Sequence, residues 1–303
     1  MNLAHALLLF AGLAAEGLAA VPEPGAPDQA STLLAVQRKY ENAVAMSAQG
    51  RIIEAEDELR DIVGTCSRVF GKEHPDTLIN RSNLAATLAE QGKYAEAEKE
   101  NREVLSIRRR VLGEKHPDTL MSRNNLAAAL QEQGRHSEAV KEYHAVLQAR
   151  LRVLGAEHLE TLESRNNLAT AYNDQGRHAD AEKEHRLVLA LRSRLLGPRH
   201  PKTLASRNNL AAVLQELDRQ AEAEQEHRTV LDLRQQVLGA NHPDVFLSCF
   251  NLALCLEARS KPAEALGFMR RAHAGFKRTL GAGHPHTRIA GQSVSQIEAQ
   301  LKP

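Results

Sequence analysis

The sequence contains no tryptophan, and aromatic residues make up only 3% of its 303 positions. Proteins that bind single-stranded nucleic acid stack the bases on aromatic side chains. Proteins that bind duplexes rely on a strong excess of positive charge. Here the formal net charge is +1. The composition therefore argues against nucleic acid as a partner.

Cysteine is scarce as well, with only Cys66, Cys249 and Cys255. An odd and sparse set is not a disulfide framework. Cys249 and Cys255 lie six residues apart in a predicted helix, so they point to different faces. We expect all three to be small buried residues, with no disulfide and no metal centre.

Motifs of catalysis are missing too. The sequence has no glycine-rich phosphate loop and none of the patterns HExxH, GxSxG or CxxC. We therefore expect no enzymatic activity and no cofactor. The chain is 25% charged and 42% hydrophobic, which is typical of a folded protein and argues against disorder.

The N-terminal segment, residues 1–28, combines an apolar run with a linker rich in proline, glycine and alanine. The run, Leu3–Ala15, has the length of a signal peptide, but no lysine or arginine precedes it and Glu16 interrupts it. It is too short to span a membrane comfortably, so we expect no stable membrane span. We expect a cytoplasmic protein. An exported or periplasmic protein is the alternative, if residues 1–20 are a signal peptide.

Five Leu-Gly pairs recur along the chain at a constant spacing of 42 residues. Their glycines are Gly113, Gly155, Gly197, Gly239 and Gly281, and Phe70-Gly71 extends the series upstream. No insertion breaks this register. Each unit must therefore be the same structural object, stacked on its neighbours.

Each unit is predicted to contain two helices. In the copy "VLGEKHPDTLMSRNNLAAALQEQGR", Val111–Arg135, a His-Pro pair marks the start of a first helix, residues 117–133. Gly134 supplies a tight turn, and a second helix follows over residues 137–154. Gly155 is expected to end it as a left-handed cap. Alternating β-branched runs are missing, so the predicted class is all-α.

Apolar residues form one stripe on each predicted helix. A single pair of helices cannot bury both stripes, whereas stacked pairs can. In the quoted copy and the helix that follows it, the stripes contain Leu120, Leu126, Ala127, Leu130, Ala139, Val146, Leu147, Val153 and Leu154.

These residues resemble the tetratricopeptide repeat. The first part of its pattern reads Arg165-x2-Leu168-Ala169-x2-Tyr172, with arginine in place of the usual tryptophan, and the second part reads Ala139-x3-Tyr143. The period of 42 exceeds the usual 34, and this longer form is similar to the repeats of kinesin light chains. The resemblance implies a tetratricopeptide-like α-solenoid, a right-handed superhelix of antiparallel helix pairs. The heptad coiled coil of kinesin light chains is missing, so we do not expect a kinesin subunit.

Six repeats are predicted over residues 29–285. The first is degenerate, since Glu41 replaces the asparagine, and the sixth drifts, since Cys249-Phe250 replaces Arg-Asn. Residues 286–303 are expected to form a C-terminal capping helix, because this segment carries polar residues on the face that would meet water.

Each first helix carries asparagine beside its apolar stripe. From Asn125, the same helical face reaches Ala128, Ala129 and Glu132, and small residues there leave room above the helix. An amide offers one acceptor and two donors, which suits the backbone of an extended peptide. The resemblance to kinesin-light-chain repeats implies the same use. We call the predicted set the asparagine ladder: Asn83, Asn125, Asn167, Asn209 and Asn251.

Contacts specific to a partner are expected from positions that vary among the repeats. Near the helix starts these are Ile79, Met121, Glu163, Ala205 and Leu247, and near the helix ends they are Gln131, Asn173 and Gln215. The predicted function is a scaffold or adaptor that binds a peptide segment of a partner protein in a concave groove. Two alternatives stay open: a signalling sensor whose groove takes a small or peptide effector, and a structural assembly protein. The sequence does not indicate an oligomeric state.

Other recurring polar residues have structural explanations. The preceding asparagines, Asn124, Asn166 and Asn208, are expected to bond neighbouring repeats, and the ladder residues have the same alternative role. Arg81, Arg123, Arg165 and Arg207 are expected to pair with Glu98, Glu182 or Glu224. Six histidines at helix starts, His74, His116, His158, His200, His242 and His284, are expected to be capping or turn residues, and His185 and His227 to lie between helices.

Overall fold

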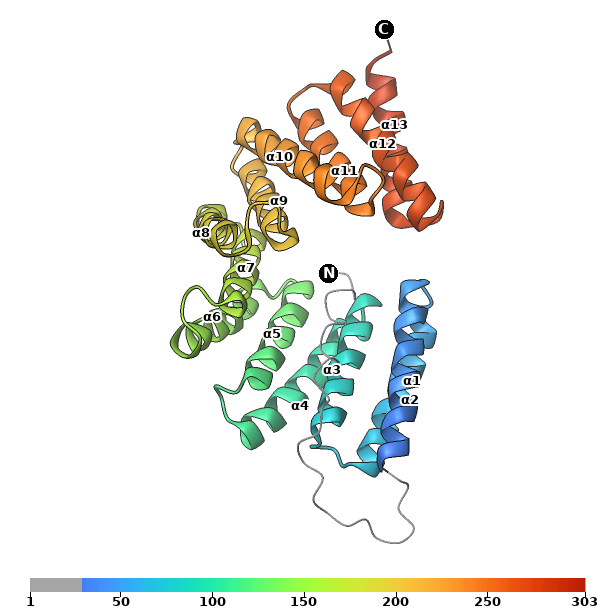
Figure 1. Ribbon diagram of the computed structural model, residues 1–303, viewed down its shortest axis with the longest axis vertical. Helices are drawn as coiled ribbons and strands as arrows, with labels where there is room; N and C mark the ends of the chain where they lie inside the picture. The colour runs from blue at the N-terminus through green and yellow to red at the C-terminus, as the bar shows by residue number, and fades with distance from the viewer. Residues whose placement is uncertain (1–28, 303) are drawn as a thin grey trace. The chain divides into compact units, whose positions relative to one another are not determined.

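The computed structural model describes residues 29–302, and within this range the chain is helical with no strand (Figure 1). The predicted N-terminal segment, residues 1–28, lies outside the described residues. The helices are α1(Gln29–Ala48), α2(Ile52–Val69), α3(Pro75–Glu90), α4(Tyr94–Leu112), α5(Pro117–Glu132), α6(His136–Val153), α7(Leu159–Asp174), α8(His178–Leu196), α9(Pro201–Glu216), α10(Gln220–Leu238), α11(Pro243–Ala258), α12(Pro262–Leu280) and α13(Pro285–Gln300). The all-α prediction is confirmed. Both ends of α5 and of α6 lie within one residue of the boundaries predicted from the sequence.

Every first helix from α3 onward begins with the same histidine cap. His116 has an extended backbone, and its Nδ1 accepts a hydrogen bond from the backbone N–H of Asp118 at 3.2 Å. This bond satisfies one of the donors that a helix start leaves open. The same contact recurs at His74, His158, His200, His242 and His284. The predicted capping role of these histidines is confirmed.

Two kinds of turn join the helices. Gly134 has φ 74°, which suits the predicted tight turn between α5 and α6. Asp218 and Ser260 occupy the same place in later repeats with φ of 57° and 56°, a conformation that strains an L side chain. At the end of the second helix α6, Gly155 has the positive φ that the prediction requires, 86°. Gly113 has φ 88° and ψ 165°, a region that is essentially limited to glycine.

Small residues let the helices approach one another closely. Ala127 on α5 and Ala139 on α6 are completely buried, and they lie where the two helices of a repeat pack together. The first helices of successive repeats also touch, as α3 does α5 and α7 does α9. The first helices therefore form a row within each part of the chain.

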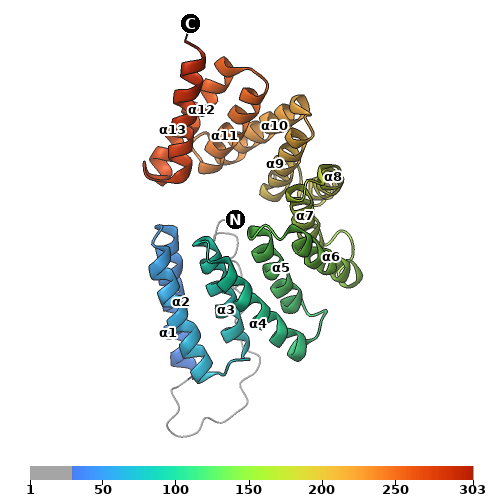
Figure 2. The same cartoon turned by 180° about the vertical axis from the view of Figure 1, so that it is seen from behind.

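The last three helices, α11, α12 and α13, pack together at the C-terminal end of the chain (Figure 2). Their core contains aromatic side chains. Phe250, Phe276 and Met269 are buried there, and the rings of Phe250 and Phe276 lie 6.0 Å apart. A Cβ atom on Gly275 would lie 2.1 Å from Cγ of Phe246, so only glycine fits beneath that ring. The predicted C-terminal helix is present as α13, and it packs on α12.

Buried glutamates on second helices join each repeat to the turn of the next. Glu98 accepts hydrogen bonds from Gln133 at 2.8 Å and Arg135 at 2.7 Å. Glu56, Glu182 and Glu224 make the corresponding bonds in their repeats, and the third repeat carries Val140 at this position. The contact of Lys93 with Glu56 lowers the pKa of that carboxyl to about 2. These bonds fix the register between neighbouring repeats.

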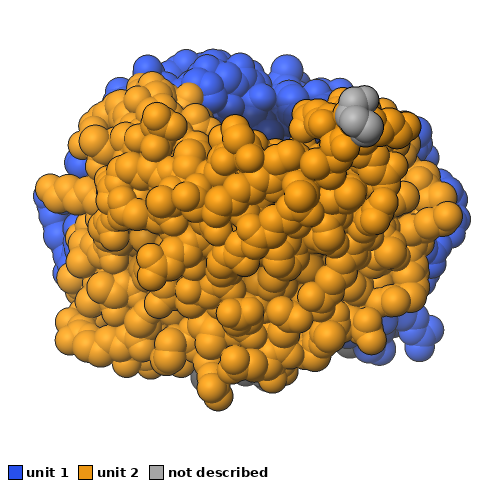
Figure 3. All heavy atoms as spheres, turned by 90° about the horizontal axis from the view of Figure 1, so that it is seen from above, with its two compact units in different colours: residues 1–153 blue, residues 154–303 orange. Residues whose placement is uncertain are grey.

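The chain divides into two compact units (Figure 3). The first ends at Val153 and contains α1 to α6, and the second begins at Leu154 and contains α7 to α13.

Candidate functional site

The ten predicted site residues all lie on first helices, and each is partly exposed. In the second unit, the ladder asparagines bond across repeats. Nδ2 of Asn209 donates to Oδ1 of Asn166 at 2.9 Å, and Nδ2 of Asn251 donates to Oδ1 of Asn208 at 2.9 Å. Each bond joins the ladder asparagine of one repeat to the asparagine that directly precedes the ladder residue in the repeat before it. The alternative role that the sequence left open is therefore present in the structure.

These cross-repeat bonds use only part of what each amide offers. A side-chain amide has two N–H donors and an oxygen with two lone pairs. The bond from Asn209 occupies one of its N–H groups, and it leaves the carbonyl oxygen of Asn209 outside the pair. Thr170 and Ala212 lie three residues beyond Asn167 and Asn209 on the same face, and they are small. The remaining hydrogen-bonding capacity therefore lies on a face with little side-chain bulk.

The ladder residues of the first unit have different surroundings. The backbone carbonyl of Asn125 accepts a bond from Nδ2 of Asn101 at 3.5 Å. The side-chain nitrogen of Asn83 is buried and has no hydrogen-bond partner among the described residues. A buried amide donor without a partner costs about 1–3 kcal/mol.

The predicted variable position Glu163 lies against a buried arginine that the sequence reasoning missed. Oε2 of Glu163 on α7 is 2.5 Å from Nη2 of Arg192 on α8. Arg192 is only 3% exposed, and its Nη1 donates to Oγ of Ser206 on α9 at 2.9 Å. The guanidinium therefore lies between two successive first helices. The signal in the sequence was the spacing of Arg108, Arg150, Arg192 and Arg234, each 42 residues from the next.

Two other members of this arginine series make the same local contacts. Nη1 of Arg108 donates to Oγ of Ser122 at 2.8 Å, and Nη1 of Arg234 donates to Oγ of Ser248 at 2.9 Å. Burial lowers the pKa of both guanidinium groups, and Asp118 and Asp244 partly oppose that effect. Neither arginine forms an ion pair within the described part of the chain. In place of Glu163, their repeats carry Ile79 and Ala205.

The predicted positions near the helix ends contact histidines. Oδ1 of Asn173 is 2.8 Å from Nδ1 of His178, and Oε1 of Gln215 is 3.4 Å from Nε2 of His227. His227 is almost fully buried between α9 and α10, as predicted, and burial lowers its pKa to about 4. The side chain of Gln215 is therefore held in place by a contact with a neutral imidazole.

Arginines at the usual tryptophan position pair within their own repeats, but with other glutamates than predicted. Arg123 pairs with Glu142 at 2.5 Å, and Arg165 pairs with Glu184 at 2.6 Å. Arg81 and Arg207 make the same pair with Glu100 and Glu226. The expected partners, such as Glu98, lie two residues earlier, and they hold the neighbouring repeat instead. These cations are neutralised, which favours a structural role.

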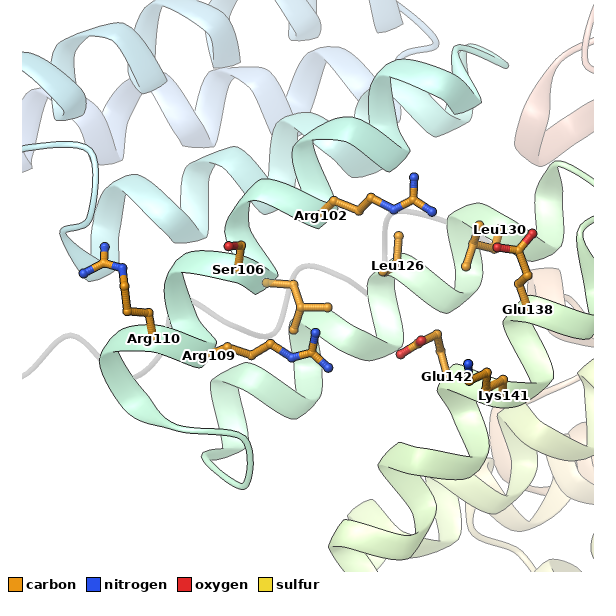
Figure 4. Close-up of a pocket in the computed structure, with 10 residues that line it drawn as sticks. Arg102, Ser106, Arg109, Arg110, Leu126, Leu130, Glu138, Lys141 and Glu142 are labelled. Carbon is orange, nitrogen blue, oxygen red and sulfur yellow. The ribbon is translucent and has the colours of Figure 1, made fainter.

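The first unit also contains a pocket of about 680 Å³ between α4 and α6, with α5 as its floor (Figure 4). Its charged lining includes Arg102, Arg109 and Lys141, and its apolar lining consists of Leu105 on α4 and Leu126 and Leu130 on α5. Arg102 is 2.6 Å from Glu98, and Arg109 is 3.0 Å from Glu114. Since most of its charge is already balanced, the pocket does not indicate a ligand.

The part of the chain that the structure describes holds no group of three or more residues placed to bind a metal ion. Cys66, Cys249 and Cys255 are buried and free, as expected. None of the described helices is long and apolar enough to cross a membrane.

Family comparison agrees with the helix pairs and their register. A model of the tetratricopeptide repeat matches residues 28–110, 80–143, 122–186, 165–236 and 208–278. The chain belongs to the tetratricopeptide repeat family. No curated protein matches it.

Solved structures with a similar fold include other tetratricopeptide repeat proteins. One is a kinesin light chain of Podosopora anserina with nearly identical TPR-like repeats, which is 29% identical, with a TM-score of 0.59 over 68% of this chain and 98% of that one. BtubC (BKLC) from P. vanneervenii is 21% identical, with a TM-score of 0.58 over 86% of this chain and 94% of its own. A Rap protein complexed with Competence and Sporulation Factor is 15% identical, with a TM-score of 0.52 over 89% of this chain and 76% of its own. The last two resemblances concern the fold alone.

Proposed function

We propose that the protein is an interaction scaffold whose first helices bind an extended peptide segment of a partner protein. The observation that carries this proposal is that partly exposed side-chain amides recur at 42-residue intervals. In the second unit, these amides have donors and acceptors that the cross-repeat bonds do not use. The tetratricopeptide fold supports a role in protein binding, and the proposed role involves no catalysis.

The spacing of the amides suits a peptide main chain. Helices that pack side by side lie about 8–10 Å apart, and an extended chain advances about 3.3 Å per residue. One amide per repeat therefore corresponds to about three peptide residues. Asn209 and Asn251 would each offer an acceptor and a donor to the peptide backbone, and the positions of Glu163, Gln215 and their equivalents would contact its side chains.

Selection from a phage-displayed library of random 12-residue peptides tests this proposal. Peptides enriched on the full chain are expected to lose at least tenfold in affinity for the Asn209→Ala, Asn251→Ala double variant, because each lost amide removes one or two hydrogen bonds. The control is Asn166→Ala with Asn208→Ala. It breaks the same cross-repeat bonds from the acceptor side but keeps the ladder residues.

Equal loss in both double variants would show that the bonds act only through structure. Enrichment of no peptide at all would contradict the peptide-binding role itself. Thermal unfolding of all variants, followed by circular dichroism, separates loss of binding from loss of fold.

A signalling sensor is the second candidate, because a Rap protein of this fold is solved in complex with Competence and Sporulation Factor. In a sensor, the bound peptide changes the conformation of the chain. Small-angle scattering with and without a selected peptide tests this, and an unchanged radius of gyration would favour the scaffold.

A further inference from the structure

Arg192 and Arg234 occupy equivalent places in successive repeats of the second unit. Each begins on a second helix and donates from Nη1 to a serine Oγ on the next first helix, Ser206 at 2.9 Å and Ser248 at 2.9 Å. Each also donates from Nη1 to a backbone carbonyl of that helix, at 3.4 Å and 3.2 Å. The sequence therefore places both guanidinium groups against the same two kinds of neutral oxygen. The carbonyl belongs to Lys202 in the first case and to Asp244 in the second, where the Asp244 carboxylate acts on Arg234 without forming an ion pair.

The two sites differ in what covers the guanidinium. Nη2 of Arg192 is 2.5 Å from Oε2 of Glu163, and only 4% of the arginine side chain stays exposed. Ala205 stands 42 residues after Glu163, in the same place on α9, and its side chain ends at Cβ. Arg234 is correspondingly more exposed than Arg192, and none of its contacts within the described residues is a carboxylate ion pair.

A partly buried guanidinium without an ion pair favours a carboxylate ligand. The group is planar and presents five N–H donors in a fork that fits a carboxylate, and it stays charged even where burial lowers its pKa. Charge-assisted bonds of this kind are about twice as strong as neutral ones. The two contacts of Arg234 use Nη1 only, and both acceptors are neutral oxygens.

We propose that Arg234 is the position at which the bound segment places an acidic side chain, and that Glu163 is an internal carboxylate that closes the equivalent position on Arg192. This inference rests on the proposed peptide-binding function. Ala205 lies one helical turn before the ladder residue Asn209. A peptide whose backbone is bonded to Asn209 could therefore extend an acidic side chain past Ala205 to Arg234. Glu163 and Ala205 then determine which repeat accepts the acid, and so fix the register of the segment.

Two substitutions exchange which arginine has an internal carboxylate partner and which has none. Ala205→Glu supplies Arg234 with an internal carboxylate in the manner of Glu163, and Glu163→Ala opens Arg192. Ala221→Glu is the matched control, because it adds the same charge to an exposed position near the start of α10, outside the first helices and 13 residues before the arginine. Arg234→Gln removes the guanidinium and keeps a polar side chain of similar length.

The probe is a peptide selected on the wild-type chain from the 12-residue library, together with its variant in which the acidic residue becomes the matching amide. The wild type is expected to bind the acidic form about 10–100-fold more tightly, the range given by a charge-assisted bond of about 1.5–3 kcal/mol. This ratio should fall below about threefold in Ala205→Glu and in Arg234→Gln, and it should persist in Ala221→Glu.

Selection on Glu163→Ala should enrich peptides with a second acidic residue about three positions from the first, since one repeat spans about three extended residues. Peptides that bind but ignore the change from acid to amide would overturn this inference and leave the proposed function standing. A ratio that persists in Arg234→Gln would also overturn it. Failure to select any peptide would instead count against the proposed function.

Discussion

Asn251 donates a hydrogen bond from Nδ2 to Oδ1 of Asn208, one repeat earlier, over 2.9 Å. The two residues are 43 positions apart, one more than the period of the repeat, so the bond joins a ladder asparagine to the asparagine that directly precedes the ladder residue of the repeat before it. Because Asn209 and Asn166 make the same bond, the "NN" dipeptide links successive first helices in the second unit. In the function that we propose, one side chain would have two uses, since the amide that bonds the neighbouring repeat would also bond the peptide.

The cross-repeat bond predicts a measurable coupling. Asn251→Ala should lower the free energy of unfolding by about 1 kcal/mol, the usual net contribution of one hydrogen bond. The double variant Asn208→Ala, Asn251→Ala should cost little more than either single one, because each single variant already breaks the bond. Urea denaturation of the four proteins measures this cycle, and strictly additive effects would contradict the pairing.

Two turns carry strain that glycine would relieve. Asp218 and Ser260 have φ of 57° and 56°, where the equivalent Gly134 has φ 74°. Asp218→Gly and Ser260→Gly should each raise the free energy of unfolding by about 1 kcal/mol, because a side chain in this region costs about 1–2 kcal/mol. Gly134→Ala should lower it by a similar amount. The test is the urea midpoint at constant m-value, and a glycine variant less stable than wild type would show that local side-chain contacts outweigh the strain.

The histidine cap of α5 makes a prediction about side-chain chemistry. His116→Ala should lower the free energy of unfolding by about 1 kcal/mol, because the backbone N–H of Asp118 loses its acceptor. His116→Asn and His116→Ser should retain most of the stability, because both residues are good caps at helix starts. Thermal unfolding distinguishes them. Equal losses in all three variants would mean that the imidazole acts through packing rather than as an acceptor.

The period of the sequence was enough to predict the helices, because residues that start or end a helix, such as His116-Pro117 and Gly134, act on the backbone next to them. The pairing of side chains between helices was harder, because it depends on how far one helix is rotated against the next. Arg81 therefore pairs with Glu100 and not with Glu98 two residues earlier, because Glu98 bonds the turn of the neighbouring repeat. Arg192 was missed because an arginine in an apolar stripe looks like a surface residue until Ser206 and Glu163 are brought beside it.

Acid sensitivity should come from two buried histidines in the second unit. His185 and His227 replace an aromatic residue, Tyr143 in the third repeat, and burial lowers the pKa of each to about 4. The folded protein therefore keeps both imidazoles neutral while the unfolded chain binds protons near pH 6.5. Their contribution to stability is complete above pH 6.5, and it is lost as the pH falls from 6.5 toward 4.

In that window, each histidine should lower the free energy of unfolding by up to about 1.4 kcal/mol per pH unit. The lowered pKa values of Glu56 and Glu224, both about 2, act in a separate window below pH 4.5. His227→Tyr should therefore lose less stability than wild type between pH 7 and pH 5, measured by urea denaturation at each pH. All other titratable groups are common to both proteins, so the difference between the two curves isolates His227. Parallel curves for the two proteins would mean that folding does not lower the pKa of His227.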